Sequence, residues 1–422
     1  MPTPGGPRKI TFEASWANLL SLPPRLRNVF RFYTPTELNF ARGKLKEAGA
    51  LIKSTGINRP FIVTDDFLAK SDGFQEFLRV LEAAGLNPAT WTQVQPDPPD
   101  TSIDQAAEEY RRTGCDGVIG YGGGSSMDTA KGVAIIAAMG GASIREFMPP
   151  DARPVTAVAP LVCIPTTSGT GSEVTQFAVV TDTRPNPHVK SGVVSPVLHP
   201  RMAIVDPAVT DRMPPKLTAS TGMDAFAHAI EAYTSRLENP ISDALSLYAI
   251  EIIGRHLPRA VYDGSDREAR DAMSLAAVIA GISFDNGLVH FGHAIGHALG
   301  ARYHIPHGTA VAMPIPAGME FVRPAREEKL TKVAAAMGVK VDTFISPSEA
   351  AEAAIDAISR LKADSGIPTL AEATMASPEE LRTVAEQAMK DGSTFFNPRP
   401  VSAEDYLHIL EETMDEGQIG YH

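Results

Sequence analysis

The sequence has 422 residues, and its hydrophobic content of 43% is enough to build the cores of two domains of ordinary size. Its 38 basic and 50 acidic residues give a formal net charge of −12, so the charge balance does not favour binding to nucleic acid or to an anionic membrane. The two cysteines, Cys115 and Cys163, lie in apolar runs, which excludes a disulfide framework or a thiolate metal cluster. With no apolar run long enough to span a bilayer and no secretory signal pattern, we expect a cytoplasmic protein.

Residues 30–212 show alternating strand and helix patterns. Short β-branched or apolar runs are separated by segments whose apolar residues recur at helical spacing. This alternation predicts a doubly wound, mostly parallel sheet. Strands are expected in residues 60–66 and 89–94 and around 118–119, and helices in 74–84, in 103–113 and from Ser126 onward.

After about residue 213 the segments lengthen, Ala and Leu dominate, and no convincing strand pattern returns. Apolar residues at helical spacing predict helices in residues 217–236, 240–257, 267–284 and 347–366, the last closed by a glycine. The sequence therefore predicts three parts: a leader rich in Pro and Gly (1–29), an α/β domain (30–212) and an all-helical domain (213–422).

Polar or glycine residues follow three of the expected strands. Asp65 ends the first, where a carboxylate can accept a hydrogen bond from a ribose hydroxyl or can cap a helix. Gly122, Gly123 and Gly124 follow the strand at 118–119, where backbone amides and a helix N-terminus would suit a pyrophosphate. The pattern matches neither the G-x-G-x-x-G fingerprint nor the P-loop, so a glycine-rich turn without a ligand is the alternative. Thr166 and Thr167 follow a third strand, and the three strand ends together predict a nucleotide crevice.

Carboxylate and imidazole groups in the helical part indicate a metal site. Asp224 and His228 are four residues apart, which places them on one helical face. Five of the eleven histidines fall within residues 290–308, and His293 and His297 repeat the same spacing. Such donors suit Fe(II), Zn(II) or Mn(II), but helical spacing alone allows several histidine trios.

Five motifs resemble those of the iron-containing (group III) alcohol dehydrogenases and occur in the order of that family. They read "GGGSSMDTAK", "IPTTSGTGSEVTQFAVV", "DPAVTDRMPPKLTASTGMDAFAHAIEAYTS", "GHAIGHALGARYHIPHG" and, more weakly, "STFFNPRPVSAEDYLHIL". The resemblance extends from about residue 30 to the C-terminus. It implies an N-terminal α/β domain that binds NAD(P), an all-helical C-terminal domain, and one divalent metal in the cleft between them.

The motif match also implies roles for individual residues. The metal ligands would be Asp224, His228, His293 and His307, while His297 would be a catalytic histidine that does not bind the metal. His290 and His304 depart from the family pattern. We expect a structural role for His290, with an outer partner of the metal site or a substrate contact as the alternative, and a surface position for His304. The positions matched to cofactor contacts are Asp65, Gly122, Gly123, Gly124, Ser125, Asp128, Thr166, Thr167, Thr175, Phe177 and Lys190.

The activity implied is reversible, metal-dependent hydride transfer between a small alcohol and NAD, which yields an aldehyde. Fe(II) is the expected metal and Zn(II) the alternative, and a homodimer is expected. An alternative enzyme class is an NAD-using carbon-oxygen lyase or cyclase that resembles dehydroquinate synthase, which shares this general architecture. A hydroxyacid-oxoacid transhydrogenase is a second alternative. A nucleotide-sensing protein without catalysis is the alternative outside enzymes.

Overall fold

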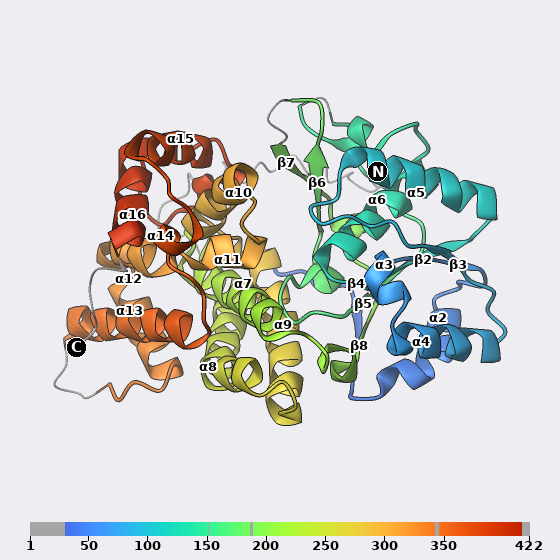
Figure 1. Ribbon diagram of the computed structural model, residues 1–422, viewed down its shortest axis with the longest axis horizontal. Helices are drawn as coiled ribbons and strands as arrows, with labels where there is room; N and C mark the ends of the chain where they lie inside the picture. Colours follow the sequence, from blue (N-terminus) through green and yellow to red (C-terminus); the bar gives the residue numbers. More distant parts are fainter. Residues whose placement is uncertain (1–29, 151, 186–188, 342–345, 416–422) are drawn as a thin grey trace, which may run out of the picture.

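The computed structural model describes residues 30–150, 152–185, 189–341 and 346–415 (Figure 1). The expected leader at 1–29 lies outside these ranges. Figure 1 shows a sheet with its helices on one side of the molecule, in blue to green, and a group of helices on the other, in yellow to red. This arrangement confirms the predicted fold class, an α/β part followed by an all-helical part.

The main sheet has six strands in the order β1-β8-β5-β4-β2-β3, and every neighbouring pair is parallel. A separate antiparallel hairpin, β6–β7, was not expected from the sequence. The strands are β1 (Glu37–Phe40), β2 (Pro60–Val63), β3 (Ala89–Trp91), β4 (Gly117–Gly122), β5 (Leu161–Pro165), β6 (Phe177–Asp182), β7 (Val189–Val194) and β8 (Met202–Val205).

Helices cover both faces of the main sheet, because its central strands are apolar on both sides. Phe61 and Val63 of β2 belong to a core cluster shared with α5 and α6, whereas Ile62 between them belongs to a cluster shared with α2 and α4. The helices of this half are α2 (Ala48–Ser54), α3 (Asp66–Ala69), α4 (Asp72–Ala83), α5 (Asp100–Thr113) and α6 (Gly124–Met139).

Helix α6 begins at Gly124, two residues before the predicted start at Ser126. The prediction was wrong here because it read the glycine run as a turn. Gly123 supplies the N-cap with extended backbone, and Gly124 already has helical geometry. The glycines therefore bring the helix N-terminus directly to the end of β4.

In the part of the chain that the structure describes, only helices and short turns follow β8. The predicted glycine after α13 is confirmed, because Gly366 adopts a positive φ of 71° just beyond the helix. These helices are α7 (Pro215–Thr234), α8 (Pro240–Tyr262), α9 (Arg267–Gly287), α10 (Phe291–Tyr303), α11 (His307–Ala312), α12 (Ile315–Ala336), α13 (Pro347–Asp364), α14 (Leu370–Ala373), α15 (Pro378–Ala388) and α16 (Ala403–Asp415).

One apolar cluster holds the helical half together, and its members come from every long helix between α7 and α16. Ala and Gly are frequent among the buried residues of α7, α10 and α11, which lets these helices pack closely. Among the described residues no single helix has both the length and the apolar composition needed to cross a membrane, and α9 with α10 meets that criterion only as a pair bent by 106°.

Candidate metal centre and nucleotide crevice

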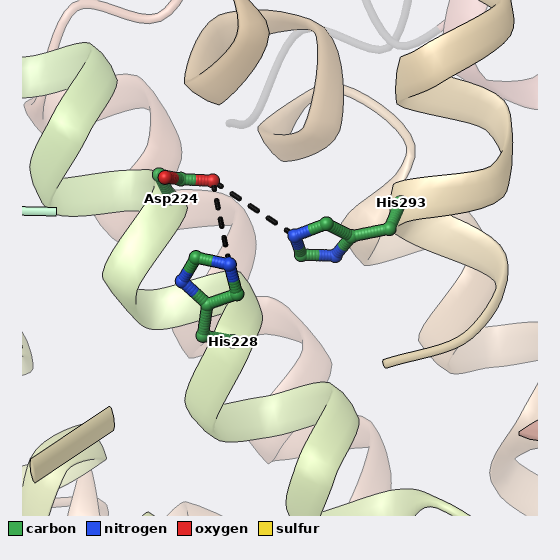
Figure 2. Close-up of side chains that lie close together, drawn as sticks. All are labelled: Asp224, His228 and His293. Carbon is green, nitrogen blue, oxygen red and sulfur yellow. Dashed lines mark ion pairs between the residues drawn. The ribbon is translucent and has the colours of Figure 1, made fainter. Parts of the chain in front are cut away.

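The four side chains predicted as metal ligands come from three helices and converge. Asp224 and His228 lie one turn apart on α7, His293 lies on α10, and His307 is the first residue of α11. The Nε2 atoms of His228, His293 and His307 lie 4.0, 3.9 and 3.6 Å from Oδ1 of Asp224. Figure 2 shows the Asp224 carboxylate facing the rings of both His228 and His293. Helix packing thus brings together residues up to 83 positions apart, from 224 to 307.

The donor atoms fit a divalent metal ion. Asp224 Oδ1 and His293 Nε2 are buried and have no hydrogen-bond partner, which is costly unless a ligand completes them. In a tetrahedral site with bonds of about 2.1 Å, neighbouring donor atoms are about 3.4 Å apart, close to the separations seen here. Ligand atoms of Asp224, His228 and His293 also lie within 4.8 Å of one another.

Burial keeps the three imidazoles in the neutral form that a metal requires. Loss of solvent lowers the pKa of His293 to about 3 and places the pKa values of His228 and His307 well below their ordinary range. Burial also raises the pKa of Asp224 to about 7, because water no longer stabilises its charge. A bound cation would supply the positive charge that this carboxylate lacks.

Glu231 is a residue of this centre that the sequence analysis missed. It is fully buried on α7, and one of its oxygens accepts from His293 Nδ1. Its other oxygen accepts from the backbone amides of His290 and Gly292, at 3.0 and 2.7 Å. The available signal was its position three residues after His228, on the same face of the helix.

His297 lies beside the ligands but bonds elsewhere. Its ring stacks on that of His307 with centroids 5.3 Å apart, and its Nδ1 lies 2.8 Å from Oδ2 of Asp391. Burial opposes ionisation of Asp391, but the hydrogen bond and charge of His297 and the bonds from Ser393 together outweigh it and hold the pKa of Asp391 well below its ordinary value. Asp391 follows α15, in the loop just before the weakest of the five motifs, and was also missed.

The two histidines without an assigned role occupy different environments. His290 is fully buried, and its Nε2 lies 3.0 Å from the hydroxyl of Thr234. His304 is exposed at the C-terminal end of α10, with a positive φ of 56°. His290 therefore belongs to the packed interior next to Glu231, whereas His304 ends a helix at the surface.

The nucleotide positions gather at the carboxyl ends of adjacent parallel strands. Asp65 follows β2, Gly122 ends β4, and Thr166 follows β5, and these strands are neighbours in the order β5-β4-β2. The chain places β3 on one side of β2 and β4 on the other, so the winding direction reverses there. Ligands of open α/β sheets bind at such a switch point.

Two of the three glycines where β4 meets α6 leave no room for a side chain, namely Gly122 and Gly124. Gly122 has a φ of 151°, and a Cβ at this position would overlap the Ser126 side chain. A Cβ at Gly124 would come within 2.9 Å of Thr170. Together with Ser125, these glycines bring backbone amides and the positive end of α6 to the crevice, as binding of a pyrophosphate requires.

Three other predicted cofactor contacts have partners within the protein. Asp65 caps α3 by accepting from the Leu68 amide at 2.8 Å. Asp128 accepts from the Ser172 hydroxyl at 2.7 Å and from the Val179 amide. Thr175 accepts from the buried ammonium of Lys131, a third residue that the sequence analysis missed.

The crevice and the metal centre adjoin. A Cβ at Gly169, in the loop after β5, would lie 2.7 Å from Cβ of Thr221, one turn before Asp224 on α7. The ring of Phe177 stacks on Phe284, and Phe284 stacks on the ring of His228. Lys190 of β7 is paired with Asp97 at 2.7 Å. Its positive charge lies near enough to Asp224 to counter part of the rise that burial causes in the pKa of that carboxyl.

Comparison with known proteins identifies the family. Residues 35–207 match the model of iron-containing alcohol dehydrogenases, and residues 218–414 match the C-terminal model of the same family. The chain belongs to the iron-containing alcohol dehydrogenase family. This confirms the resemblance read from the sequence motifs, and the protein is an oxidoreductase.

Individual members of the family are similar over nearly their whole length. The NAD-dependent methanol dehydrogenase of Bacillus methanolicus is 36% identical over 385 residues, covering 91% of this chain and 99% of the relative. A crystal structure of 1,3-propanediol oxidoreductase superposes with a TM-score of 0.87 at 35% identity, covering 91% of this chain and 100% of that one. Sulfoacetaldehyde reductase from Bifidobacterium kashiwanohense, in complex with NAD+, gives a TM-score of 0.83 at 28% identity, with 92% and 99% covered.

Proposed function

We propose that the protein transfers hydride reversibly between a small, primary alcohol and NAD, with one divalent metal bound by Asp224, His228, His293 and His307. The observation that carries this proposal is the convergence of these four donors beside the carboxyl-terminal edge of the sheet. The NAD-dependent relative from Bacillus methanolicus and the NAD+ complex of the reductase support the choice of cofactor.

A bound divalent metal would supply the Lewis acidity that lowers the pKa of the alcohol hydroxyl, and a bound nicotinamide would supply the hydride acceptor. The protein contributes the surroundings. The glycine loop at 122–124 and the N-terminus of α6 hold the pyrophosphate, and Thr166 and Thr167 offer hydroxyls at the next strand end. The ring of Phe284 stacks on the ring of His228 and covers that face of this ligand.

His297 takes the proton that the alcohol loses. Because the carboxylate of Asp391 only accepts hydrogen bonds, Nδ1 of His297 carries the hydrogen, and Nε2 keeps a lone pair for the incoming proton. The imidazolium that forms is stabilised by the adjacent Asp391. The His297 side chain is 24% exposed, so the proton can then pass to solvent.

The test is a spectrophotometric screen for NADH formation with primary alcohols, diols, hydroxy acids and aromatic alcohols. The protein is first stripped of metal and reconstituted separately with Fe(II) and with Zn(II). We expect net NADH accumulation with at least one alcohol and NADH consumption with the matching aldehyde. A lyase or cyclase would form product without net NADH, and a transhydrogenase would need a second oxo substrate in place of free NAD. Absence of turnover with either metal would support the sensor alternative.

Fe(II) is the metal we propose for the site, as the family name indicates, and Zn(II) is the alternative because one carboxylate and three imidazoles bind it at least as tightly.

We also propose a cytoplasmic homodimer. Phe30, Tyr33 and Leu38 are exposed apolar side chains at or near the edge strand β1, which supports an interface there. Sedimentation analysis would test the dimer.

We place the boundary between the domains at 212/213, between β8 and α7.

A further inference from the structure

Glu231 connects the structural core of α7 to one of the proposed metal ligands. Its side chain is fully buried, and all its bonds are to N–H groups of the segment that begins α10. One carboxylate oxygen accepts hydrogen bonds from the backbone amides of His290 and Gly292. The other oxygen is hydrogen-bonded to Nδ1 of His293. The carboxylate is therefore held in place from two directions.

The contact determines which nitrogen of His293 can bind a metal. Burial raises the pKa of Glu231, and the backbone amides of His290 and Gly292 counter this by donating to its carboxylate. As a carboxylate Glu231 has no hydrogen to donate, so Nδ1 of His293 then carries the hydrogen of the neutral ring. Nε2 then has the free lone pair. This atom has no partner within the protein and lies 3.9 Å from Oδ1 of Asp224, on the metal side of the ring.

The geometry also fixes where the ring points. Asp224, His228 and Glu231 project from the same helix, so α7 supplies two ligands and the group that orients a third. A Cβ at Gly292 would come within 3.2 Å of the Glu231 carboxylate, so the start of α10 packs directly against it. Among the described residues, no carboxylate other than that of Asp224 lies within 4.0 Å of the ring nitrogens of His228 or His307.

We propose that Glu231 is a positioning residue of the metal centre, which sets the tautomer and orientation of His293 and so raises the affinity for the metal. This inference rests on the proposed function, since it requires the four-ligand site. Outer partners of metal-bound histidines contribute roughly 10–100-fold to affinity when they hold the ring in its binding form.

Glutamine is the informative replacement, because it keeps the shape of the side chain but has only one accepting oxygen. In Glu231→Gln that oxygen can face the two backbone amides or His293, and never both. If the NH2 group faces His293, Nδ1 must accept, and the hydrogen moves to Nε2, where it blocks the metal. If the NH2 group faces the backbone, it opposes two N–H donors.

The experiment measures Zn(II) and Co(II) dissociation constants by competition with a chromophoric chelator, for the full chain and its variants. We expect Glu231→Gln to bind both ions about 10–100-fold more weakly than the unmodified protein. Asp243→Asn is the matched control, since it neutralises a partly buried carboxylate on α8 that pairs with Lys329 and not with a ligand. His228→Ala, which removes a ligand, marks the loss expected for an incomplete site.

A purely structural role would give a different pattern. In that case we expect Glu231→Gln, like Asp243→Asn, to lower the unfolding temperature of metal-free protein and to leave the metal dissociation constants unchanged, which would overturn the proposal. The Co(II) visible spectrum adds a second readout, because a changed ligand geometry shifts its d–d bands while NADH binding stays the same.

If Glu231→Gln does not fold, Glu231→Asp decides, because it keeps the charge but withdraws the carboxylate by one methylene from Nδ1. A loss of metal affinity of about tenfold or more supports the inference, and an unchanged constant overturns it. Failure of the unmodified protein to bind metal would instead refute the proposed function itself. The two failures are therefore distinguishable.

Discussion

The histidines at 290, 293 and 297 lie close together in the sequence but differ in role, because their ring nitrogens contact different groups. Nδ1 of His293 is hydrogen-bonded to Glu231, and Nε2 of His293 faces the metal side. Nδ1 of His297 is hydrogen-bonded to Asp391. His290 instead bonds Thr234 in the interior. Because all three are the same residue type, their chemistry comes from these partners and from burial.

Replacing His297 by Ala should leave the metal in place and slow turnover. The residue is not one of the four converging donors, so metal content by elemental analysis should equal that of the unmodified protein. Loss of an acid-base group typically costs roughly 10²–10⁴ in rate, and we expect kcat to fall within that range. Loss of metal from His297→Ala would show that this histidine is a ligand.

Replacing Asp65 by Ser separates two roles of the same carboxylate. Serine can keep the helix cap, as Ser71 does for α4 by accepting from the Phe74 amide at 3.2 Å. The unfolding temperature should therefore change little. Removing the negative charge should lower the preference for NAD over NADP about tenfold or more, measured as the ratio of kcat/KM values. An unchanged ratio would show that Asp65 only caps α3.

At the scale of elements, glycines set the distance between the three helices that carry ligands. A Cβ at Gly308 would overlap the carbonyl oxygen of Ser220 on α7, and a Cβ at Gly296 of α10 would come within 2.8 Å of the backbone of Val311 on α11. Ordinary side chains at these two positions would hold the helices apart. The convergence of His293 and His307 on Asp224 therefore depends on them.

Replacing Gly308 by Ala should push α11 away from α7 and impair the metal centre. Overpacking of this kind costs about 1–3 kcal/mol in free energy of unfolding, which denaturation of metal-free protein by urea would measure. Metal content should fall as well, since His307 is the adjacent residue. The control is Gly254→Ala on α8, where the nearest atom would lie 3.9 Å away. That change should be neutral or stabilise by about 0.5–1 kcal/mol.

At the scale of the whole molecule, the sheet and the helices are connected by polar side-chain contacts as well as by the crevice. Arg42, just after β1, bonds Asp211 at 2.7 Å and Asp271 of α9 at 2.5 Å. His199, before β8, lies 2.9 Å from Asp285 of α9 and is buried with it. Both contacts join the first part of the chain to α9.

Replacing Arg42 by Met should weaken this connection while keeping most of the apolar packing of the stem. The side chains of Arg42, Asp211 and Asp271 are 25%, 32% and 40% exposed, so solvent screens both pairs. We expect a loss of about 1 kcal/mol in free energy of unfolding at low salt and a smaller loss at high salt. A difference that does not depend on salt would indicate lost packing instead of lost charge.

Much of the fold could be predicted because secondary structure follows local patterns. Apolar residues at helical spacing located α7, α8, α9 and α13, and apolar runs before turns located β2 and β4. The start of α6 was placed two residues late, since a glycine run reads as a turn until its contacts with β5 are known. The β6–β7 hairpin lacked a pattern that separates it from the parallel sheet.

The features of the site also fall into two groups, those that local sequence patterns predict and those that depend on the tertiary structure. By itself the sequence determined the residue types, the shared faces of Asp224 with His228 and of His293 with His297, and the family, through motifs in a fixed order. Only the tertiary structure decided that Glu231 orients His293, that Asp391 pairs with His297, and that Asp65 caps a helix. The physical reason is distance along the chain. Periodicity reports neighbours within a few turns, whereas residues 297 and 391 are 94 positions apart and meet only when helices pack.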